Sequence, residues 1–435
     1  MSLEYFNKLS PSRKLIIGFL LAIIIGTLLL MMPFSLNEGE SLGFLESMFT
    51  IVSAICVTGL TVVDVSKVFN PVGDLIILFF IQLGGLGVMT FSSIIFMVMG
   101  KRMTFHEREL LKEERNADSS GVTVFVIESV GALILAWEFS KEMPFDKALF
   151  FGVFHSVSAF CNAGFALFST NLEAYKANPV INLTIAYLIT LGGIGFAVIS
   201  SVIMVIRRGI DRFNLTSKVA IIISMILTFG GMIVFFVLEY SNPATLGDLN
   251  FFQKILASYF QSVTLRTAGF NTIPLQDLRA ATIFICCILM FIGASPGSTG
   301  GGIKTTTFGI ILFYVIGIVK KRESIEIFNR RLDWEVMNRA LAILVLALTY
   351  VSVIITLLLI IEDFPVEEII FEVISAFGTV GLTLGITPEL SSISKLLIIV
   401  TMFVGRLGPL TFALAIGEDK KKALIKYPKE NILVG

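Results

Sequence analysis

Cys56-Val57-Thr58-Gly59-Leu60 is the first of four short glycine-centred phrases in this 435-residue chain. The central glycines are 105, 105 and 112 residues apart, which indicates one unit laid down four times. Four equivalent backbone turns at membrane depth would surround one axis with carbonyl oxygens, the arrangement by which a pore replaces the water around a cation. The other phrases are Cys161-Asn162-Ala163-Gly164-Phe165, Arg266-Thr267-Ala268-Gly269-Phe270 and Gly378-Thr379-Val380-Gly381-Leu382.

The composition is that of an integral membrane protein. Hydrophobic residues make up 55% of the chain and charged residues 15%, and the mean hydropathy is +0.88. Crossing the hydrocarbon takes about 20 helical residues. Eight charge-poor runs predict eight crossings, near Leu15–Pro33, Leu75–Met99, Gly121–Trp137, Val180–Ile206, Val219–Leu238, Ala280–Val319, Ala340–Ile361 and Leu396–Ile416.

Lysine and arginine predict the orientation. Most of them fall in the two terminal segments and in loops at one end of the predicted crossings, such as Lys101–Arg115, Arg207–Lys218 and Lys320–Arg339. The positive-inside rule therefore places both termini in the cytoplasm. The outer segments carry an excess of carboxylates, which predicts an acidic outer mouth that concentrates cations, although scattered solvated loop carboxylates are the alternative.

Between the crossings of each pair lies an apolar segment too short to span. We expect these segments to be half-membrane helices that re-enter and turn back, with the glycine turn facing an interior cavity. Three of them share a Ser-Ala pair shortly before the glycine, as in Ser53-Ala54. The four segments are Leu42–Ile55, Phe145–Phe160, Phe251–Val263 and Pro365–Phe377.

One repeat is therefore a crossing, a half-helix, a glycine turn and a second crossing. The predicted fold is an all-α integral membrane protein, in which four such repeats have pseudo-fourfold symmetry around a central pore. Residues 1–435 form a single pore-forming domain. Its parts are repeat one (14–100), repeat two (119–208), repeat three (216–320), repeat four (338–417) and a cytoplasmic tail (418–435).

Glycine has a mechanical reason at each turn. Carbonyls line a narrow path only when alternate residues take backbone angles that a side chain disfavours, and glycine adopts them freely. The alternative for any single copy is a glycine that caps the end of a helix. Four copies in register with matching flanks favour the pore.

The second crossing of repeat four contains an arginine. Repeats one and two have Leu83-Gly84-Gly85-Leu86-Gly87 and Leu191-Gly192-Gly193-Ile194-Gly195, where small residues let helices approach closely. Arg406 replaces the middle glycine in repeat four. An intramembrane charge is a functional candidate, here a positive charge in the conduction path, and a structural arginine satisfied by carbonyls is the alternative. Glu128, in the third crossing, is expected to be paired inside the bundle.

The second crossing of repeat three breaks at Gly293-Ala294-Ser295-Pro296-Gly297-Ser298-Thr299-Gly300-Gly301-Gly302-Ile303-Lys304. No helix continues through this run, so we expect an irregular loop packed against a polar cavity. A flexible loop below the glycine turns would act as a gate; a passive kink is the alternative. A phosphate-binding loop is excluded because Ile303 separates Gly302 from Lys304 and no strand precedes the run.

No catalytic constellation stands out, and we expect no enzymatic activity. Cysteines Cys286 and Cys287 lie within an apolar run, and Cys56 and Cys161 lie beside glycine phrases, so all four are expected to behave as small hydrophobic residues. Two histidines, His106 and His155, are too few for a metal or acid/base cluster.

These features resemble the Trk/Ktr/HKT potassium transporter superfamily. The resemblance rests on the fourfold plan, the Thr-Ala-Gly-Phe-Asn and Thr-Val-Gly-Leu-Thr phrases, Arg406 in Gly-Arg-Leu-Gly-Pro-Leu-Thr-Phe, and the broken helix of repeat three. It covers the whole chain and is strongest for the membrane subunits of bacterial Ktr systems. It implies potassium uptake across the bacterial cell membrane through a gated, channel-like pore.

The resemblance also implies site residues and partners. Potassium would bind the carbonyls of a filter formed by Val57–Leu60, Asn162–Phe165, Thr267–Phe270 and Thr379–Leu382. Residues Gly293 to Lys304 would form the intramembrane gate, with Arg406 in the pore close to it. The chain would form a homodimer and dock on a KtrA-like cytoplasmic ring. ATP, ADP or NAD(H) would bind that ring rather than this chain, no covalent cofactor is expected, and sodium is a candidate stimulating ion.

Two alternative functions remain at this stage. One is a sodium-permeable or weakly selective relative; substituting serine for a filter glycine is the family's known route to sodium, and all four glycines here argue against it. The other is an alternating-access transporter, which predicts inverted repeats, whereas every repeat here has the same orientation.

Overall fold

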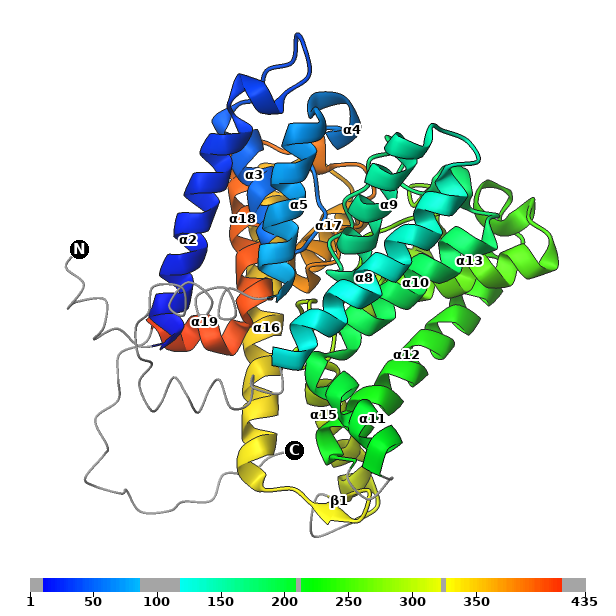
Figure 1. The fold of residues 1–435 in the computed structure, drawn as a ribbon. Coiled ribbons are helices and arrows are strands. Elements are labelled where there is room, and N and C mark those ends of the chain that lie inside the picture. Colours follow the sequence, from blue (N-terminus) through cyan, green and yellow to red (C-terminus); the bar gives the residue numbers. More distant parts are fainter. Residues whose placement is uncertain (1–10, 87–117, 209–212, 322–325, 417–435) are drawn as a thin grey trace.

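The computed structural model describes residues 11–86, 118–208, 213–321 and 326–416. These residues are mostly helical (Figure 1). The amino-terminal part forms α2 (Pro11–Leu30), η1 (Pro33–Ser35), α3 (Phe44–Ile55), α4 (Val65–Val68), α5 (Pro71–Leu86), α8 (Asp118–Phe139), α9 (Phe145–Phe160), η2 (Glu173–Tyr175), α10 (Pro179–Ile194) and α11 (Phe196–Arg208).

The carboxy-terminal part contains the loop singled out above and a short antiparallel hairpin. Its elements are α12 (Leu215–Glu239), η4 (Pro243–Gly247), α13 (Phe251–Thr264), α14 (Ala280–Phe291), α15 (Thr305–Val319), β1 (Glu326–Ile327), β2 (Arg330–Arg331), α16 (Trp334–Ile361), α17 (Val366–Gly378), η5 (Thr387–Glu389), α18 (Ser392–Leu407) and α19 (Pro409–Ile416).

Helices lie at all four segments predicted as half-helices, namely α3, α9, α13 and α17, with ends within two residues of the prediction. Their starts have local causes. The Asn250 side chain accepts a hydrogen bond from the backbone amide of Gln253, and the Gln253 side chain accepts one from the backbone amide of Asn250, which forms a capping box at α13. The α9 and α17 helices follow prolines, Pro144 and Pro365, whose missing amides suit a helix start.

Two of the predicted crossings are each divided into two helices, breaks that the sequence did not predict. Val180–Ile206 divides into α10 and α11, which meet at a bend of 98°. Leu396–Ile416 divides into α18 and α19. The residues at the breaks, Gly195 and Gly408, have φ angles of 95° and 85°, which end a right-handed helix. The predicted break between α14 and α15 is confirmed.

The number of crossings stays a prediction. In the described ranges, α12 and α16 are by themselves long and apolar enough to span a membrane, and the bent pair of α10 and α11 would add a third span. Shorter apolar helices include α5, α14 and α15. Large apolar side chains such as Val237 (66% exposed) and Ile360 (76%) lie on the surface of α12 and α16, as expected for helices that face lipid.

Glycines bring the second helix of three repeats against the base of the half-helix. A Cβ atom on Gly84, Gly192 or Gly405 would overlap the carbonyl of Ile55, Phe160 or Phe377 respectively, and each of those residues ends or nearly ends a half-helix. The predicted role of these glycines in close helix approach is confirmed. In Figure 1 the half-helices lie in the upper part of the molecule, whereas α11, α15 and the β1–β2 hairpin lie at the lower end.

Several predicted features lie outside the described residues. They are the end of repeat one (87–100), the whole Lys101–Arg115 loop with His106, parts of the other two basic loops, and the tail at 418–435.

Candidate ion pathway

The glycine turns share one backbone pattern. In each, the first residue of the predicted filter and the glycine two positions later have positive φ, and the residue between them does not. The predicted alternation of backbone angles is therefore found at all four turns. The left-handed conformation is costly for the β-branched residues Val57, Thr267 and Thr379, and it persists only where the surroundings enforce it.

The four turns meet at one place. They contact one another in the cyclic order Gly59, Gly164, Gly269, Gly381 and back to Gly59. A Cβ atom on Gly164 would lie 2.8 Å from Gly269 Cα, and one on Gly381 would lie 2.9 Å from Gly59 Cα. A side chain at any of these positions would therefore collide with the neighbouring turn.

A hydroxyl near the end of each half-helix holds the turn that follows. Ser53 and Ser375 accept hydrogen bonds from the amides of Gly59 (3.0 Å) and Gly381 (3.1 Å). In the other two repeats the hydroxyl is the donor: Ser158 donates to the carbonyl of Phe165 (2.8 Å) and Thr264 to that of Phe270 (2.6 Å). The Ser-Ala pairs noted in the sequence thus include the serine that fastens the turn.

The loop of Gly293 to Lys304 lies directly against the turns of repeats three and four. The amide of Gly301 donates to the hydroxyl of Thr379 at 2.8 Å. Gly300 packs against Thr267 so closely that a Cβ atom there would overlap its hydroxyl. The Asn162 amide group and the Thr267 hydroxyl are 3.2 Å apart, which joins the turns of repeats two and three.

Backbone hydrogen bonds also attach this loop to the break between α10 and α11. The amides of Ser295 and Thr299 donate to the carbonyls of Gly193 (3.0 Å) and Gly192 (3.2 Å), and the amide of Phe196 donates to the carbonyl of Gly297 (3.0 Å). The loop is thus irregular but well hydrogen-bonded, as backbone within a membrane protein requires.

Arg406 joins this loop to repeat one. Its guanidinium donates to the carbonyls of Thr299 and Gly84. Lys304 reaches back within the loop, and its ammonium donates to the carbonyl of Gly300 at 2.6 Å. Carbonyls satisfy both cations, which fits the structural alternative for Arg406 and also puts its positive charge beside the loop.

The family assignment follows from comparison with known proteins. Residues 9–423 match the protein family described as TrkH, a cation transport protein. The chain belongs to the TrkH family of cation transport proteins. The match spans all four glycine phrases, the loop and Arg406.

Curated relatives and a solved structure agree with this assignment. The Ktr system potassium uptake protein B of Bacillus subtilis is 42% identical, over 98% of this chain and 97% of that protein. The potassium/sodium uptake protein NtpJ of Enterococcus hirae is 38% identical, over 99% and 98%. The crystal structure of the potassium transporter TrkH from Vibrio parahaemolyticus has the same fold, with a TM-score of 0.72 at 20% identity over 92% of this chain and 84% of that one.

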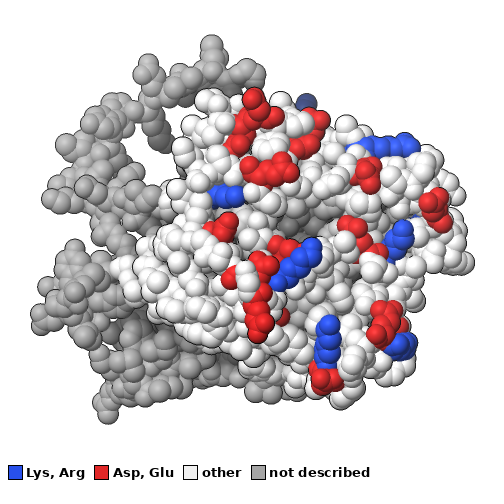
Figure 2. Space-filling model, turned by 90° about the horizontal axis from the view of Figure 1, so that it is seen from above, with Lys and Arg blue, Asp and Glu red and all other residues white. Residues whose placement is uncertain are grey.

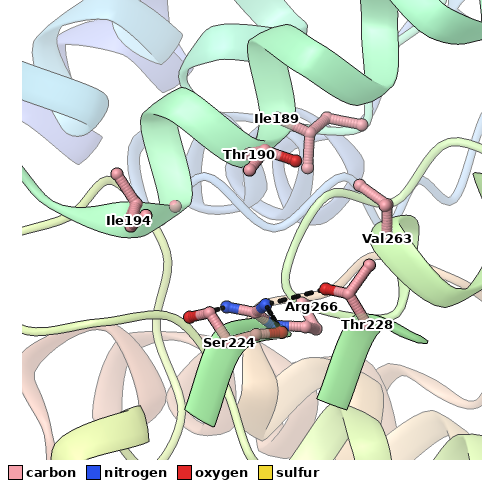
Figure 3. Close-up of a pocket in the computed structure, with 8 residues that line it drawn as sticks. Ile189, Thr190, Ile194, Ser224, Thr228, Val263 and Arg266 are labelled. Carbon is pink, nitrogen blue, oxygen red and sulfur yellow. Dashed lines mark hydrogen bonds between the residues drawn. The ribbon is translucent and has the colours of Figure 1, made fainter. Parts of the chain in front are cut away.

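Arg266 is a feature of the site that sequence reasoning missed. Its side chain reaches α12, where its guanidinium donates to the carbonyl and hydroxyl of Ser224 (3.0 and 2.8 Å) and to the hydroxyl of Thr228 (3.1 Å) (Figure 3). It lines a small cavity with Thr190 and Val263. The signal was present: the same position holds cysteine, cysteine and glycine in the other repeats.

Glu128 is paired inside the bundle, as expected. Its carboxylate oxygens accept hydrogen bonds from the amide of Gln82 at 3.2 and 3.3 Å. Gln82 in turn accepts one from the thiol of Cys161, which directly precedes the turn of repeat two.

The upper face carries prominent acidic side chains around a hollow (Figure 2). Glu173 accepts a hydrogen bond of 2.8 Å from the side chain of Asn271, the residue after the turn of repeat three. Burial, together with Asp277, raises the pKa of Glu173, and the Asn271 hydrogen bond and Lys176 oppose this shift. Asn271 also accepts a backbone bond from Leu172 (3.0 Å), so the outer loop of repeat two supports the turn of repeat three.

Proposed function

We propose that this protein carries potassium ions into the cell through a gated pore. The observation that supports this most directly is the contact ring of four glycine turns, each with alternating left-handed residues. Carbonyls arranged around one axis replace the hydration shell of a dehydrated cation. Ktr system relatives named as potassium uptake proteins are 42% and 36% identical to this chain over nearly its full length.

The four repeats would surround the axis with pseudo-fourfold symmetry. Potassium would bind carbonyls of Val57 to Leu60, Asn162 to Phe165, Thr267 to Phe270 and Thr379 to Leu382. The half-helices end at these turns, so their negative carboxyl ends favour a cation there, each by a fraction to about 1 kcal/mol. The acidic outer face would raise the local cation concentration before entry.

The loop of Gly293 to Lys304 would be the gate. It contacts the turns through Gly300 and Gly301, so its position controls the space directly below them. Arg406 would hold the loop and place a positive charge next to the path, which opposes a cation at that level until the loop moves.

The proposed setting is that of a Ktr-type system in a bacterial cell membrane. Two copies of the chain would form a homodimer with both termini in the cytoplasm, and a KtrA-like ring that binds ATP, ADP or NAD(H) would control the gate. Sodium stimulation is part of the same proposal. The chain itself would need no covalent cofactor and would catalyse no reaction.

Growth complementation tests the function. Cells that lack potassium uptake systems would express the chain with and without a KtrA-like partner and grow at low potassium. Rescue is the expected result, and failure in both conditions would contradict potassium uptake. Deleting Ser295 to Gly302 would test the gate separately: uptake should become less dependent on the partner, and unchanged regulation would remove the gate from the proposal.

A sodium-permeable transporter is the second candidate. It is favoured by the relative named potassium/sodium uptake protein at 38% identity. Parallel flux measurements with ⁸⁶Rb⁺ and ²²Na⁺ in proteoliposomes would separate the two: a large preference for rubidium supports potassium selectivity, and similar fluxes support the second candidate.

A further inference from the structure

One position on the half-helices differs in chemistry among the repeats. It lies seven residues before the first left-handed residue of each turn and is occupied by Thr50, His155, Phe260 and Glu372. All four side chains are fully buried. Burying an imidazole or a carboxylate is costly unless hydrogen bonds compensate, so two of the four repeats carry a polar group here that requires an explanation.

We propose that His155 and Glu372 are positioning residues that fix the outer flank of the ion filter in repeats two and four, and thereby set the discrimination between potassium and sodium. The inference deepens the proposed function and rests on it. Each side chain joins its half-helix to the segment that leaves the glycine turn.

Glu372 does so with both carboxylate oxygens. Oε2 accepts a hydrogen bond from the hydroxyl of Thr383 at 2.7 Å, and Oε1 accepts one from the hydroxyl of Thr387 at 2.6 Å. Thr383 is two residues beyond Gly381, and its hydroxyl also accepts from the amide of Gly385 (3.0 Å). No ion pair to Glu372 is found in the part of the chain that the structure describes, so hydroxyl groups alone hold this carboxylate.

His155 has the equivalent role in repeat two. Its Nδ1 lies 2.7 Å from the carbonyl of Phe151, so this nitrogen carries the proton and donates. Its Nε2 is then free to accept the amide of Leu167 at 3.2 Å, three residues beyond Gly164. The ring also stacks on Phe168, with centroids 5.0 Å apart, which holds it in this orientation.

The other two repeats lack this connection. The Thr50 hydroxyl donates to the carbonyl of Glu46 within its own helix (2.9 Å), and Phe260 has no polar atom to offer. The hydrogen bond between a hydroxyl near the end of the half-helix and the glycine turn occurs in all four repeats. The bonds made by His155 and Glu372 are therefore an addition that repeats two and four have and the other two lack. In the cyclic order of contacts these two repeats are opposite each other.

The connection bears on selectivity because sodium and potassium differ little in size. A ring of carbonyls distinguishes them only if it resists the small rearrangement that would accommodate the other ion. A segment fixed to a buried helix at two opposite points resists better than one held by the turn alone. Releasing either point should therefore admit sodium without abolishing potassium transport.

Proteoliposomes containing the purified full chain test this inference. The ratio of ⁸⁶Rb⁺ to ²²Na⁺ flux would be compared for wild type, Glu372→Ala, Glu372→Gln, His155→Ala and the double variant. Each alanine variant removes one or two hydrogen bonds, so the ratio should fall by about tenfold. Glu372→Gln keeps an acceptor oxygen and should lie between wild type and Glu372→Ala, and the double variant should fall furthest.

Thr50→Val is the matched control. It changes the same position of repeat one and removes only a bond within the helix, so its flux ratio should equal that of wild type. Thr387→Val removes one hydrogen-bond donor from Glu372 and tests the role of Glu372 even if Glu372→Ala fails to fold. Its ratio of ⁸⁶Rb⁺ to ²²Na⁺ flux should fall by a few fold.

The outcomes separate the two proposals. Rubidium-selective flux in wild type with unchanged ratios in the folded variants would overturn the positioning role alone. An equal fall in Thr50→Val would also overturn it, because any disturbance of a half-helix would then suffice. Absence of flux of either ion through wild type, both with and without a KtrA-like partner, would overturn both this inference and the proposed function.

Discussion

The amide of Gly301 donates a hydrogen bond of 2.8 Å to the hydroxyl of Thr379. The two residues are 78 positions apart in the chain, and they join the irregular loop of repeat three to the glycine turn of repeat four. Thr379 itself has a left-handed backbone, with φ of 49°. A movement of the loop would therefore break or displace a hydrogen bond to a turn whose backbone is already strained.

The contact ring predicts the effect of a methyl group at Gly381. In Gly381→Ala the new Cβ would collide with the Thr58 carbonyl, and φ of 88° is unfavourable for alanine by roughly 1–2 kcal/mol. We expect rubidium flux in proteoliposomes to fall by about tenfold or more. Gly230→Ala is the control, because nothing lies within 4 Å of a Cβ atom there; equal loss in both variants would contradict the ring.

Arg406 predicts a change in control rather than a simple loss. Arg406→Gln removes the guanidinium that joins the carbonyls of Gly84 and Thr299, and with it a positive charge next to the path. Flux through the chain without any partner should rise by about tenfold or more, on the scale of one charged hydrogen bond of about 1.5–3 kcal/mol. The flux of Arg406→Lys should lie between those of wild type and Arg406→Gln, because an ammonium keeps the positive charge but lacks the planar set of donors of a guanidinium.

The control for this variant is an exposed arginine. Arg339 pairs with Glu335 at 2.6 Å, and both side chains are about 70% exposed (70% and 74%). Such a pair contributes little, about 0–1 kcal/mol, so Arg339→Gln should leave flux unchanged. Basal flux in Arg406→Gln equal to that of wild type would show that the arginine does not restrain the loop.

The break between α10 and α11 predicts a second route to the gate. Gly195 has φ of 95°, and a Cβ atom there would lie 2.5 Å from the carbonyl of Pro296. Gly195→Ala should displace the loop and change the partner-dependent component of flux by a factor of about three or more, as expected for the loss of roughly 1 kcal/mol of packing and backbone energy. Measuring the flux of wild type and Gly195→Ala with and without the partner checks this. If the ratio of flux with the partner to flux without it is the same in both proteins, the break between α10 and α11 has no role in gating.

The outer loops predict a pH dependence of stability. Burial raises the pKa of Glu173, so the folded protein binds a proton there at a higher pH than the unfolded chain does. The ionised carboxylate consequently costs stability at neutral pH, and this cost is lost as the pH falls through the folded-state pKa. Glu173→Gln should raise the unfolding temperature at pH 7 and have no such effect at pH 4, near the ordinary pKa of glutamate, about 4.3.

Thermal unfolding in detergent at the two pH values measures this effect. Glu38→Gln, at an exposed position in another outer loop, is the control and should shift the unfolding temperature little. A stabilisation by Glu173→Gln that is equal at both pH values would point to hydrogen bonding rather than charge.

The sequence alone determined the repeated unit. Half-helix ends, the positive φ of the turn glycines and the break in repeat three depend on neighbouring residues: caps, prolines and the absence of a side chain. The apolar runs that predict membrane crossings depend on the composition of about 20 consecutive residues, which is also a local property. These features could therefore be predicted without knowing what packs against them.

Tertiary structure decided the connections between repeats. The break at Gly195 was missed because glycines in an apolar run are equally compatible with a straight helix that packs closely on its neighbour. The backbone of the repeat-three loop, which is distant in sequence, bonds to the chain at this break. The direction of Arg266 and the partners of Arg406 and Glu372 also depend on segments brought together by folding. A buried polar group must find hydrogen bonds somewhere, but the sequence does not say which carbonyl or hydroxyl will be within reach.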